Sequence, residues 1–459
     1  MRILIVLFLM LLYRNAVSQS PRQYIFDQKN QYRWLSEYAS FLSIPNVLGD
    51  SVNIVRNAQF ISDMLKQNGV KSELLPSGKP NSAPVVYGEV LVPGATTTLA
   101  FYAHYDGQPV NPKQWAEGLE PFKPMLMSDR IDKNGKSISF PSEGEAIHGN
   151  WRLYGRGSSD DKAGVFAIIK AYETLLKTGK KPSVNIKFFF EGEEELGSTH
   201  LDEIFKKNKE KLQTDLWVII DGPRHVSGKK MISFGVRGDV NMNLTVYGPK
   251  RPLHSGNYGN WAPNPALSLV QLLATMKDDK GHILVEGYYD DVIPLSSQEK
   301  EALSKIPNIE ETLKKELGIA EPEGNGRSFL ESLHLPTLNI NGIKSADVGE
   351  LGANIIPTKA EAMLDLRLVL GNEVDKQINK VTRHIEKNGF HVIDHEPTDE
   401  ERLKYSKLIK ITRSVGYPAQ RTSFDLPIVQ SMVKAVQATV DYPVVLIPSM
   451  GGSLPLFSF

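Results

Sequence analysis

Short clusters of acidic and histidine residues recur along the first half of this chain, each where an apolar strand is expected to end or a helix to begin. The clusters are His104-Tyr105-Asp106, Asp160-Asp161, Glu194-Glu195 and Asp221. Ligand sites in open α/β sheets gather at the carboxyl ends of the strands, so successive clusters of this kind are expected to meet. Imidazole and carboxylate groups suit zinc or a similar divalent ion. The pattern therefore predicts an α/β fold with one metal site at the ends of neighbouring parallel strands.

Apolar periodicity assigns each cluster to an element. The expected elements are strands over 85–92, 98–103, 184–190 and 216–220 and helices over 51–65 and 165–176. The strand over 98–103 runs directly into His104, and the continuous apolar run over 216–220 stops at Asp221. Asp160-Asp161 comes just before a helix that lies beside these strands.

The pattern changes near residue 234, where a second domain is expected to begin. Its expected elements are strands over 240–246 and 360–370 and helical stretches over 266–276 and 299–317. Asn264-Pro265 offers an N-cap and a first-turn residue for the helix over 266–276. The stretch over 299–317 is rich in Glu and Lys, so we expect it to present a solvated face.

Length and charge narrow the classes of function. The chain has 459 residues, 41% of them apolar, which is enough for two or three domains with real cores. Lys and Arg together number 53, as do Asp and Glu, so the formal net charge is zero. This balance argues against broad capture of nucleic acid or anionic membranes. Cysteine is absent, which excludes disulfides and thiolate ligands.

The first eighteen residues have the pattern of a secretory signal peptide. Arg2 precedes the apolar run 3–12, and Ala16-Val17-Ser18 supplies small residues at alternate positions. The run is too short for a stable membrane anchor. We therefore expect a secreted or periplasmic protein; the alternative is a buried N-terminal helix.

Four motifs carry a resemblance to a known family. They are His104-Tyr-Asp-Gly-Gln-Pro, Gly155-Arg-Gly-Ser-Ser-Asp-Asp-Lys, Glu191-Gly-Glu-Glu-Glu-Leu-Gly-Ser and Leu253-His-Ser-Gly. With these motifs the chain resembles the carnosinase and nonspecific-dipeptidase branch of the co-catalytic zinc exopeptidases, from about residue 30 to its last residues. That superfamily also holds aminoacylases, acetylornithine deacetylase and bacterial glutamate carboxypeptidases.

The resemblance implies an α/β zinc-exopeptidase-like catalytic domain, with a mixed sheet flanked by helices, and an inserted α+β lid or dimerisation domain. The expected segments are a signal peptide at 1–18, the first part of the catalytic domain at 19–233, the lid at 234–400 and the second part of the catalytic domain, truncated, at 401–459. A homodimer through the lid is also expected.

The resemblance also implies roles for individual residues. The metal ligands would be His104, Asp160, Glu195 and Asp221, which would hold two zinc ions per subunit, with Asp160 bridging them in a cis Asp160-Asp161 peptide. Asp106 would orient the His104 ring through its other nitrogen. Glu194 would be the general base. Mn²⁺ or Co²⁺ would also tolerate these ligands.

Further residues would bind the substrate. His254, in the lid, would donate to the oxyanion, often across a dimer interface in the family. Arg367 would bind the terminal carboxylate of the substrate, which its planar fork of donors suits. Asn354 lies where this branch usually has threonine, and Gly452-Ser453 match a loop that also holds the carboxylate.

Taken alone, several of these residues have ordinary explanations. Asp160-Asp161 would cap a helix, residues 193–195 would form a solvated acidic turn, and Asp365 would be an ion-pair partner for Arg367. His104 and His254 would be packed or loop histidines. The glycines of Gly155-Arg-Gly resemble a dinucleotide-binding loop, but the spacing and the acids that follow fit that motif poorly. The succession of four clusters favours the metal site.

The chain departs from the family pattern near its end. The family takes a last ligand for the second metal from a histidine a few tens of residues beyond the Gly-Gly-Ser loop, whereas no histidine follows His395. Either the sequence is truncated, which we expect, or a partner or water fills that ligand position. The chain as given is expected to hold one metal better than the other.

The sequence thus predicts a secreted metal-dependent dipeptidase that cleaves a peptide bond near a free C-terminal carboxylate, with a dipeptide or small peptide as substrate and without a nucleic-acid partner or stable membrane anchor. The alternatives are an N-acyl amino acid deacylase or a carboxypeptidase of the same family, or a non-catalytic zinc-binding relative.

Overall fold

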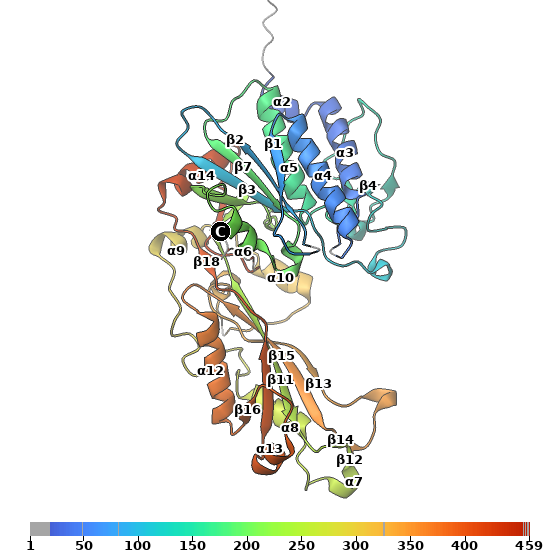
Figure 1. Cartoon of the computed structure of the whole chain (residues 1–459), viewed down its shortest axis with the longest axis vertical. Coiled ribbons are helices and arrows are strands. Elements are labelled where there is room, and N and C mark those ends of the chain that lie inside the picture. Colours follow the sequence, from blue (N-terminus) through green and yellow to red (C-terminus); the bar gives the residue numbers. More distant parts are fainter. Residues whose placement is uncertain are drawn as a thin grey trace, which may run out of the picture. The chain divides into compact units, whose positions relative to one another are not determined.

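The computed structural model describes residues 19–47, 49–80, 82–324, 326–452, 454, 456 and 459. The predicted signal peptide at 1–18 lies outside these residues. The chain divides into two compact units between Pro223 and Arg224 (Figure 1). No helix within the described ranges is long and apolar enough to cross a membrane.

A five-stranded mixed sheet forms the centre of the first unit. Its order is β1 (Lys71–Leu75), β2 (Val85–Val90), β7 (Asn185–Glu191), β3 (Thr98–His104) and β8 (Leu216–Ile219). The β7, β3 and β8 strands run parallel, whereas β1 and β2 pair antiparallel. The predicted strands are therefore confirmed, and three of them bring their carboxyl ends to the same edge of the sheet.

Helices and short elements complete the first unit. The helices are α2 (Pro21–Ile25), α3 (Gln28–Leu42), α4 (Ser51–Gln67), α5 (Lys162–Lys177) and α6 (Leu201–Lys207), with single turns η1 (Pro112–Gln114), η2 (Ile131–Lys133) and η3 (Glu194–Leu196). A small antiparallel sheet contains β5 (Ser137–Ile138), β4 (Met125–Met127) and β6 (Arg152–Tyr154). Helix α4 contacts β1 and β2, and α5 contacts β3 (Figure 1). Apolar side chains from these helices and strands form the core beneath the site.

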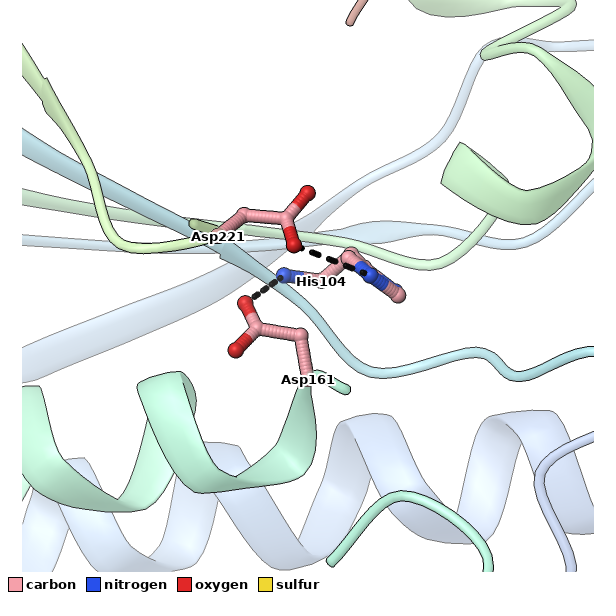
Figure 2. A group of neighbouring side chains, drawn as sticks. All are labelled: His104, Asp161 and Asp221. Carbon is pink, nitrogen blue, oxygen red and sulfur yellow. Dashed lines mark hydrogen bonds and ion pairs between the residues drawn. The ribbon is translucent and has the colours of Figure 1, made fainter. Parts of the chain in front are cut away.

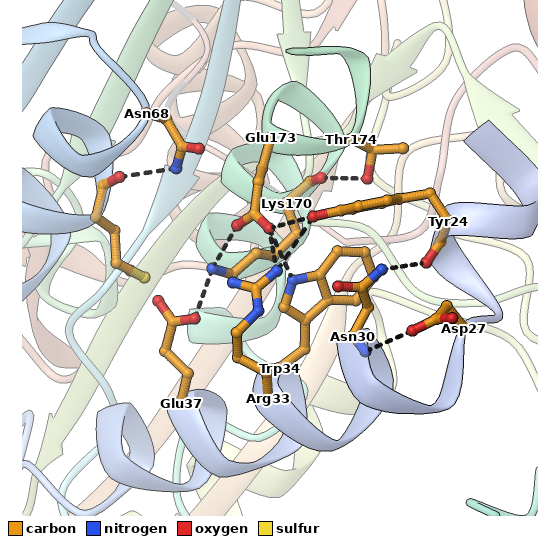
Figure 3. Close-up of polar contacts among 11 residues, drawn as sticks. Tyr24, Asp27, Asn30, Arg33, Trp34, Glu37, Asn68, Lys170, Glu173 and Thr174 are labelled. Atoms are coloured by element: carbon orange, nitrogen blue, oxygen red, sulfur yellow. Dashed lines mark hydrogen bonds and ion pairs between the residues drawn. The ribbon is translucent and has the colours of Figure 1, made fainter. Parts of the chain in front are cut away.

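A buried carboxylate attaches the N-terminal helices to α5. Glu173, with its side chain 4% exposed, accepts hydrogen bonds from Lys170 at 2.9 Å, from the Tyr24 hydroxyl at 3.1 Å and from Trp34 Nε1 at 3.3 Å. Arg33 on α3 forms an ion pair with the same carboxylate (Figure 3). Because every partner comes from α2, α3 or α5, this network fixes how the three helices pack.

The second unit is built on another five-stranded sheet. Its order is β13 (Asn339–Lys344), β15 (Lys359–Leu368), β11 (Gly238–Tyr247), β17 (Leu408–Arg413) and β16 (His391–Ile393). The side chains of β11 and β15 alternate between buried and more exposed positions, as expected for a sheet covered on one face. Apolar residues of that face pack against α8 (Pro265–Ala274) and α12 (Val374–Lys387).

Shorter elements surround this sheet. They are the strand pairs β10 (Gly235–Val236) with β18 (Gln420–Arg421), β12 (Leu253–His254) with β14 (Ile355–Ile356) and β9 (Met231–Ser233) with β19 (Val445–Ile447), the helices α7 (Ser255–Tyr258), α9 (Ser297–Ser304), α10 (Glu310–Leu317), α11 (Phe329–Ser332), α13 (Asp399–Lys404) and α14 (Pro427–Gln437), and the turn η4 (Gly349–Leu351). Asn264 caps α8 with Pro265 in its first turn, as predicted.

The single helical stretch predicted over 299–317 was wrong. Helix α9 ends at Ser304 and α10 begins at Glu310. Pro307 lies between them, and proline both lacks a backbone N–H and disfavours helical geometry in the preceding residue. Glu299 is 6% exposed because it accepts a hydrogen bond from the Ser296 backbone N–H at 2.6 Å and pairs with Arg421 at 2.8 Å. This end of the stretch is therefore not a solvated face.

The predicted domain limits at 233 and 400 stay predictions. In the structure the break between the compact units comes at Pro223, and β17, which lies beyond 400, pairs with β11 in the sheet of the second unit.

Candidate metal centre

The ends of three parallel strands bring the first candidate ligands together. His104, the last residue of β3, lies opposite Glu191 at the end of β7, and Tyr102 lies opposite Ile219 at the end of β8. The chain leaves each strand at this edge, so the loops that follow all begin side by side. This arrangement is the physical basis of the predicted cluster.

Helix α5 supplies the acidic pair from beside the sheet. Asp161 caps the helix by accepting the Gly164 N–H at 3.1 Å, and its other oxygen accepts the His104 N–H at 3.2 Å (Figure 2). A Cβ on Gly164 would lie 2.5 Å from the Ile220 carbonyl oxygen, so glycine allows the helix to start against the end of β8. The Asp160-Asp161 peptide is cis, as the resemblance implied.

The His104 ring is the centre of the group. Its side chain is 1% exposed, and Nε2 lies 3.0 Å from Asp160 Oδ1 and 3.8 Å from an oxygen of both Glu194 and Asp221. Figure 2 shows Asp221 and Asp161 on either side of His104. Sequence reasoning placed His104, Asp221 and the Asp160-Asp161 and Glu194-Glu195 clusters together, but it gave Asp161 no role at the metal. The helix-cap pattern was the available signal for Asp161.

Asp106 does more than orient the imidazole. One oxygen lies 3.3 Å from His104 Nδ1, as predicted for a carboxylate behind a ligating histidine. Its two oxygens also accept the backbone N–H groups of Glu194 at 3.2 Å and Glu195 at 3.0 Å. The side chain is fully buried. Asp106 therefore ties the loop after β3 to the acidic turn after β7.

The acidic turn itself is held on both sides. Glu193, 7% exposed, accepts the Ala83 N–H at 2.8 Å and contacts His200 Nδ1 at 2.8 Å. Glu195 accepts a hydrogen bond from Gln108 Nε2 at 2.5 Å. Glu194 lies between them with its side chain 14% exposed. The turn is thus not a solvated acidic loop, and Gln108 is a neighbour of the site that sequence reasoning missed.

Crowding raises the pKa of the carboxyl groups. Burial, together with Asp221, Asp106 and Glu195 and opposed by His104, raises the pKa of Glu194 to about 8. Burial likewise raises the pKa of Asp221 to about 6.

The same causes act on Asp161 and His104. Burial and Asp221 raise the pKa of Asp161 to about 8. Burial alone would lower the pKa of His104, but hydrogen bonds to Asp106 and Asp160 raise it to about 12. The hydrogen bond to His104 in turn lowers the pKa of Asp160. The group thus contains more carboxyl groups than one imidazolium could balance if all of them were ionised.

The donor set fits a divalent cation. Within the part of the chain that the structure describes, His104 is the only basic side chain at ion-pair distance from these carboxylates. Two triads have ligand atoms within 4.8 Å of one another, namely His104 with Asp161 and Asp221, and His104 with Asp160 and Glu195. Buried carboxylates without a counter-charge are costly, and a bound cation removes that cost.

The candidate substrate-binding residues lie in the second unit, at two places. Arg367 on β15 contacts Asp365 at 3.2 Å and Asp239, its cross-strand neighbour on β11, at 3.5 Å. The expected ion-pair partner is therefore present. Close by, the Arg237 N–H donates to the carbonyl of Gly452 at 3.2 Å. Ser453 lies outside the described residues.

The other place is near the opposite end of the same strands. His254 on β12 is paired with Ile355 on β14, and the N–H of Ser255 donates to the Asn354 carbonyl at 2.9 Å. The His254 side chain is exposed, and its Nδ1 accepts the Gly256 N–H at 3.1 Å. The structure therefore places the His254 strand beside Asn354, and it places Gly452 beside Arg237.

The sequence pattern of the peptidase family M20/M25/M40 matches residues 100–454, which include every residue of this centre. The chain belongs to this family. The predicted resemblance to the co-catalytic exopeptidases is thereby confirmed, and the chain is a metallopeptidase.

Curated M20 relatives include dipeptidases. The Cys-Gly metallodipeptidase DUG1 of Candida albicans is 28% identical over 385 residues, 80% of this chain and 75% of the relative. The human Beta-Ala-His dipeptidase is 30% identical over 326 residues, 68% of this chain and 58% of the relative.

Solved M20 structures share the fold. An M20 family metallo-carboxypeptidase from Sulfolobus solfataricus superposes with a TM-score of 0.74 at 29% identity, covering 93% of this chain and 88% of that one. The dipeptidase Dug1p from Saccharomyces cerevisiae gives 0.71 at 24% identity, covering 96% and 89%. The predicted fold class, a mixed-sheet catalytic domain with a second α+β domain, is confirmed.

Proposed function

We propose that this M20 peptidase is a secreted metal-dependent dipeptidase that cleaves the peptide bond next to a free C-terminal carboxylate. The proposal rests on the position of Glu194. Its largely buried carboxylate lies 3.8 Å from His104 Nε2, among the candidate ligands. A structural metal site has no need of such an extra carboxylate. The dipeptidase relatives support the choice of substrate.

In the proposed centre, two divalent ions would be bound by His104, Asp160, Glu195 and Asp221. Zinc is the ion that we propose. When bound, such ions activate water and stabilise negative charge on a carbonyl oxygen. They also lower the pKa of a neighbouring carboxyl group, so Glu194 would be ionised in the loaded enzyme.

Glu194 then acts as the general base and acid. It takes a proton from the attacking water and returns it to the leaving amine as the peptide bond breaks. Asp106 keeps the His104 ring oriented and fixes the backbone of Glu194, so both groups hold their positions during the transfer. His254 donates a hydrogen bond to the developing oxyanion.

Arg367 binds the terminal carboxylate of the substrate, together with the loop that contains Gly452 and Ser453. Its contacts with Asp365 and Asp239 hold the guanidinium in place. The planar fork of donors on a guanidinium suits bidentate binding of a carboxylate. Asn354 adds a polar contact beside His254. These roles follow the family resemblance and are proposals for this chain.

We propose a homodimer in which His254 serves the site of the partner subunit. The strand β15 separates the two groups, because Lys359 lies at the His254 end and Arg367 at the other. Eight residues of strand span roughly 25 Å. One dipeptide cannot bridge that distance, so a single second unit cannot bring both residues to one substrate.

The edge strand β13 offers a surface for the second copy. Among the described residues its strand partner is β15, on one side, and all six residues of β13 are exposed. Ile340 is 40% and Ile343 is 54% exposed. An unpaired edge with apolar side chains is suited to pairing with another strand.

Dipeptide hydrolysis tests the function directly. Zinc-loaded protein should cleave free dipeptides, lose activity in a chelator and regain it with added zinc. If the enzyme recognises the free α-amino group of the dipeptide, N-acetylation of the dipeptide should remove most of the activity. Faster cleavage of the acetylated peptide would favour a deacylase, and absence of cleavage with two bound ions would favour a non-catalytic relative.

A carboxypeptidase is the second candidate, because the similar Sulfolobus solfataricus protein is a metallo-carboxypeptidase that is 29% identical to this chain. Longer peptides discriminate between the two. A dipeptidase should release little from a tripeptide or tetrapeptide, whereas a carboxypeptidase should remove the last residue from each.

The secreted or periplasmic location rests on residues 1–18 alone. Expression of the full chain in a bacterium, followed by N-terminal sequencing of the exported fraction, tests it. A mature protein that begins at Gln19 is expected; cytoplasmic protein that retains Met1 would contradict the proposal.

A further inference from the structure

A lysine with no exposed surface lies directly beside the metal centre. Lys162, the first residue of α5 and the neighbour of Asp161, is fully buried. Its Nζ donates to the carbonyl oxygens of Phe41 at 2.8 Å and Ile44 at 2.7 Å, and lies 4.6 Å from the centroid of the Phe41 ring. Within the described ranges it has no carboxylate at ion-pair distance. A buried amino group is costly unless it is hydrogen-bonded, and here backbone carbonyls are the acceptors.

The carbonyls that Lys162 binds belong to a segment that also contacts the loop after β3. Two residues beyond Ile44, the fully buried Asn46 donates from Nδ2 to the Tyr105 carbonyl at 3.0 Å. The Asn46 carbonyl accepts the Gly107 N–H at 2.9 Å. The segment 41–46 therefore binds both sides of the Tyr105–Gly107 loop, which carries Asp106.

Close packing leaves this arrangement little freedom. A Cβ on Gly157 would lie 3.2 Å from Lys162 Cγ and 3.4 Å from Asn46 Nδ2. A Cβ on Gly107 would lie 2.8 Å from Asn46 Nδ2. Gly157 thus lets the loop before Asp160 close on Lys162 and Asn46, and Gly107 lets the loop after Asp106 close on Asn46.

We propose that Lys162 and Asn46 are positioning residues that brace the metal centre through the segment 41–46. Lys162 fixes the start of α5 and with it Asp160 and Asp161. Asn46 fixes the loop after β3 and with it the alignment of Asp106 behind His104. We call Lys162, Asn46 and the segment 41–46 the brace. The brace sets the distance between Asp160-Asp161 and His104 before a metal binds. This inference rests on the proposed metal centre.

Zinc affinity of the full chain tests the brace without any activity assay. Lys162→Met keeps the length of the side chain but removes the donor, and it should weaken zinc binding about 10–100-fold, the effect usual for groups that orient metal ligands. Asn46→Ala should weaken it by about 10-fold. Competition with a chromophoric chelator measures both values.

Lys170→Met is the matched control. Lys170 is a second buried lysine on α5, but it pairs with Glu37 at 2.6 Å and Glu173 at 2.9 Å, away from the ligands (Figure 3). Its loss should lower thermal stability and leave zinc affinity within about two-fold of wild type. Equal weakening in Lys170→Met and Lys162→Met would mean that general destabilisation is the cause and would overturn the brace.

The outcomes separate the brace from the metal site. If wild type binds no divalent ion, the proposed function fails; if wild type binds zinc and both brace variants bind it equally well, only the brace fails. Hydrogen exchange of wild type decides the case in which variants do not fold. The Gly107 amide should be equally protected with and without zinc, and protection that arises only with zinc would overturn the proposal.

Discussion

The metal centre and the substrate-binding residues differ in how far the chain gathers them. The candidate ligands come from one edge of one sheet and from the start of α5 beside it, and their atoms lie within a few ångströms of His104. His254, on the strand pair β12 and β14, and Arg367, on β15, both belong to the second unit. The length of β15 separates them by roughly 25 Å. Strand-end geometry gathers residues within a unit, whereas for the second group we propose that another copy of the chain completes the site.

The largest expected effect on activity comes from a change in the metal centre. Glu194→Gln should lower kcat about 10²–10⁴-fold, since proton transfer by a positioned base contributes that much. Zinc stoichiometry should not change, because Glu194 is not among the proposed ligands. Steady-state kinetics and elemental analysis measure the two quantities. The exposed Glu210→Gln variant is the control, and unchanged turnover in Glu194→Gln would refute the assignment of the base.

The next prediction tests the separation itself. His254→Ala should lower kcat roughly 10²–10³-fold, as the loss of an oxyanion donor does. Mixing it with Glu194→Gln, under conditions where subunits exchange, should restore about a quarter of wild-type activity, because half of the dimers then contain one intact site.

Complementation of this kind requires that His254 act in the partner's site. If His254 acts within its own chain, both sites of the mixed dimer carry a defect and activity should stay near the sum of the two variants. A mixture of each variant with itself provides the baseline.

Arg367→Met should have a smaller effect, on substrate binding. Removing one partner of a charged pair costs about 2 kcal/mol or more, so kcat/KM should fall about 30-fold or more. Lys359→Met, eight residues earlier on the same strand, should change kcat/KM little. A dipeptide amide, which lacks the carboxylate, should show no difference between wild type and Arg367→Met; a difference there would assign Arg367 to structure.

The smallest expected effect on activity lies outside both groups, in the buried network of Figure 3, where the change falls on stability. Burial alone would raise the pKa of Glu173, but hydrogen bonds from Arg33 and Lys170 lower it to about 2, below the ordinary value of 4.5. The stabilisation is therefore present above pH 4.5 and is lost as the pH falls from 4.5 towards 2.

Glu173→Gln should thus lower the free energy of unfolding by about 3 kcal/mol at neutral pH, and the difference from wild type should shrink below pH 4.5. Urea unfolding at pH 7 and pH 3 measures it. Zinc affinity should not change, because the network lies on the far part of α5; a parallel loss of zinc binding would show that α5 transmits the damage.

The sequence alone determined the strands, the helix after Asp161 and the strand-end cluster, because apolar periodicity is local and parallel strands end at one edge. It could not separate α9 from α10 correctly, since the charge pattern outweighed Pro307 in the prediction.

Only the tertiary structure decided the rest. That Asp106 binds the backbone of Glu194, that Asp161 joins the group, and that Lys162 and Asn46 meet through the segment 41–46 all depend on contacts between residues far apart in sequence. The separation of His254 from Arg367 depends likewise on strand register. Packing and register arise from the whole fold, so no local pattern in the sequence carries them.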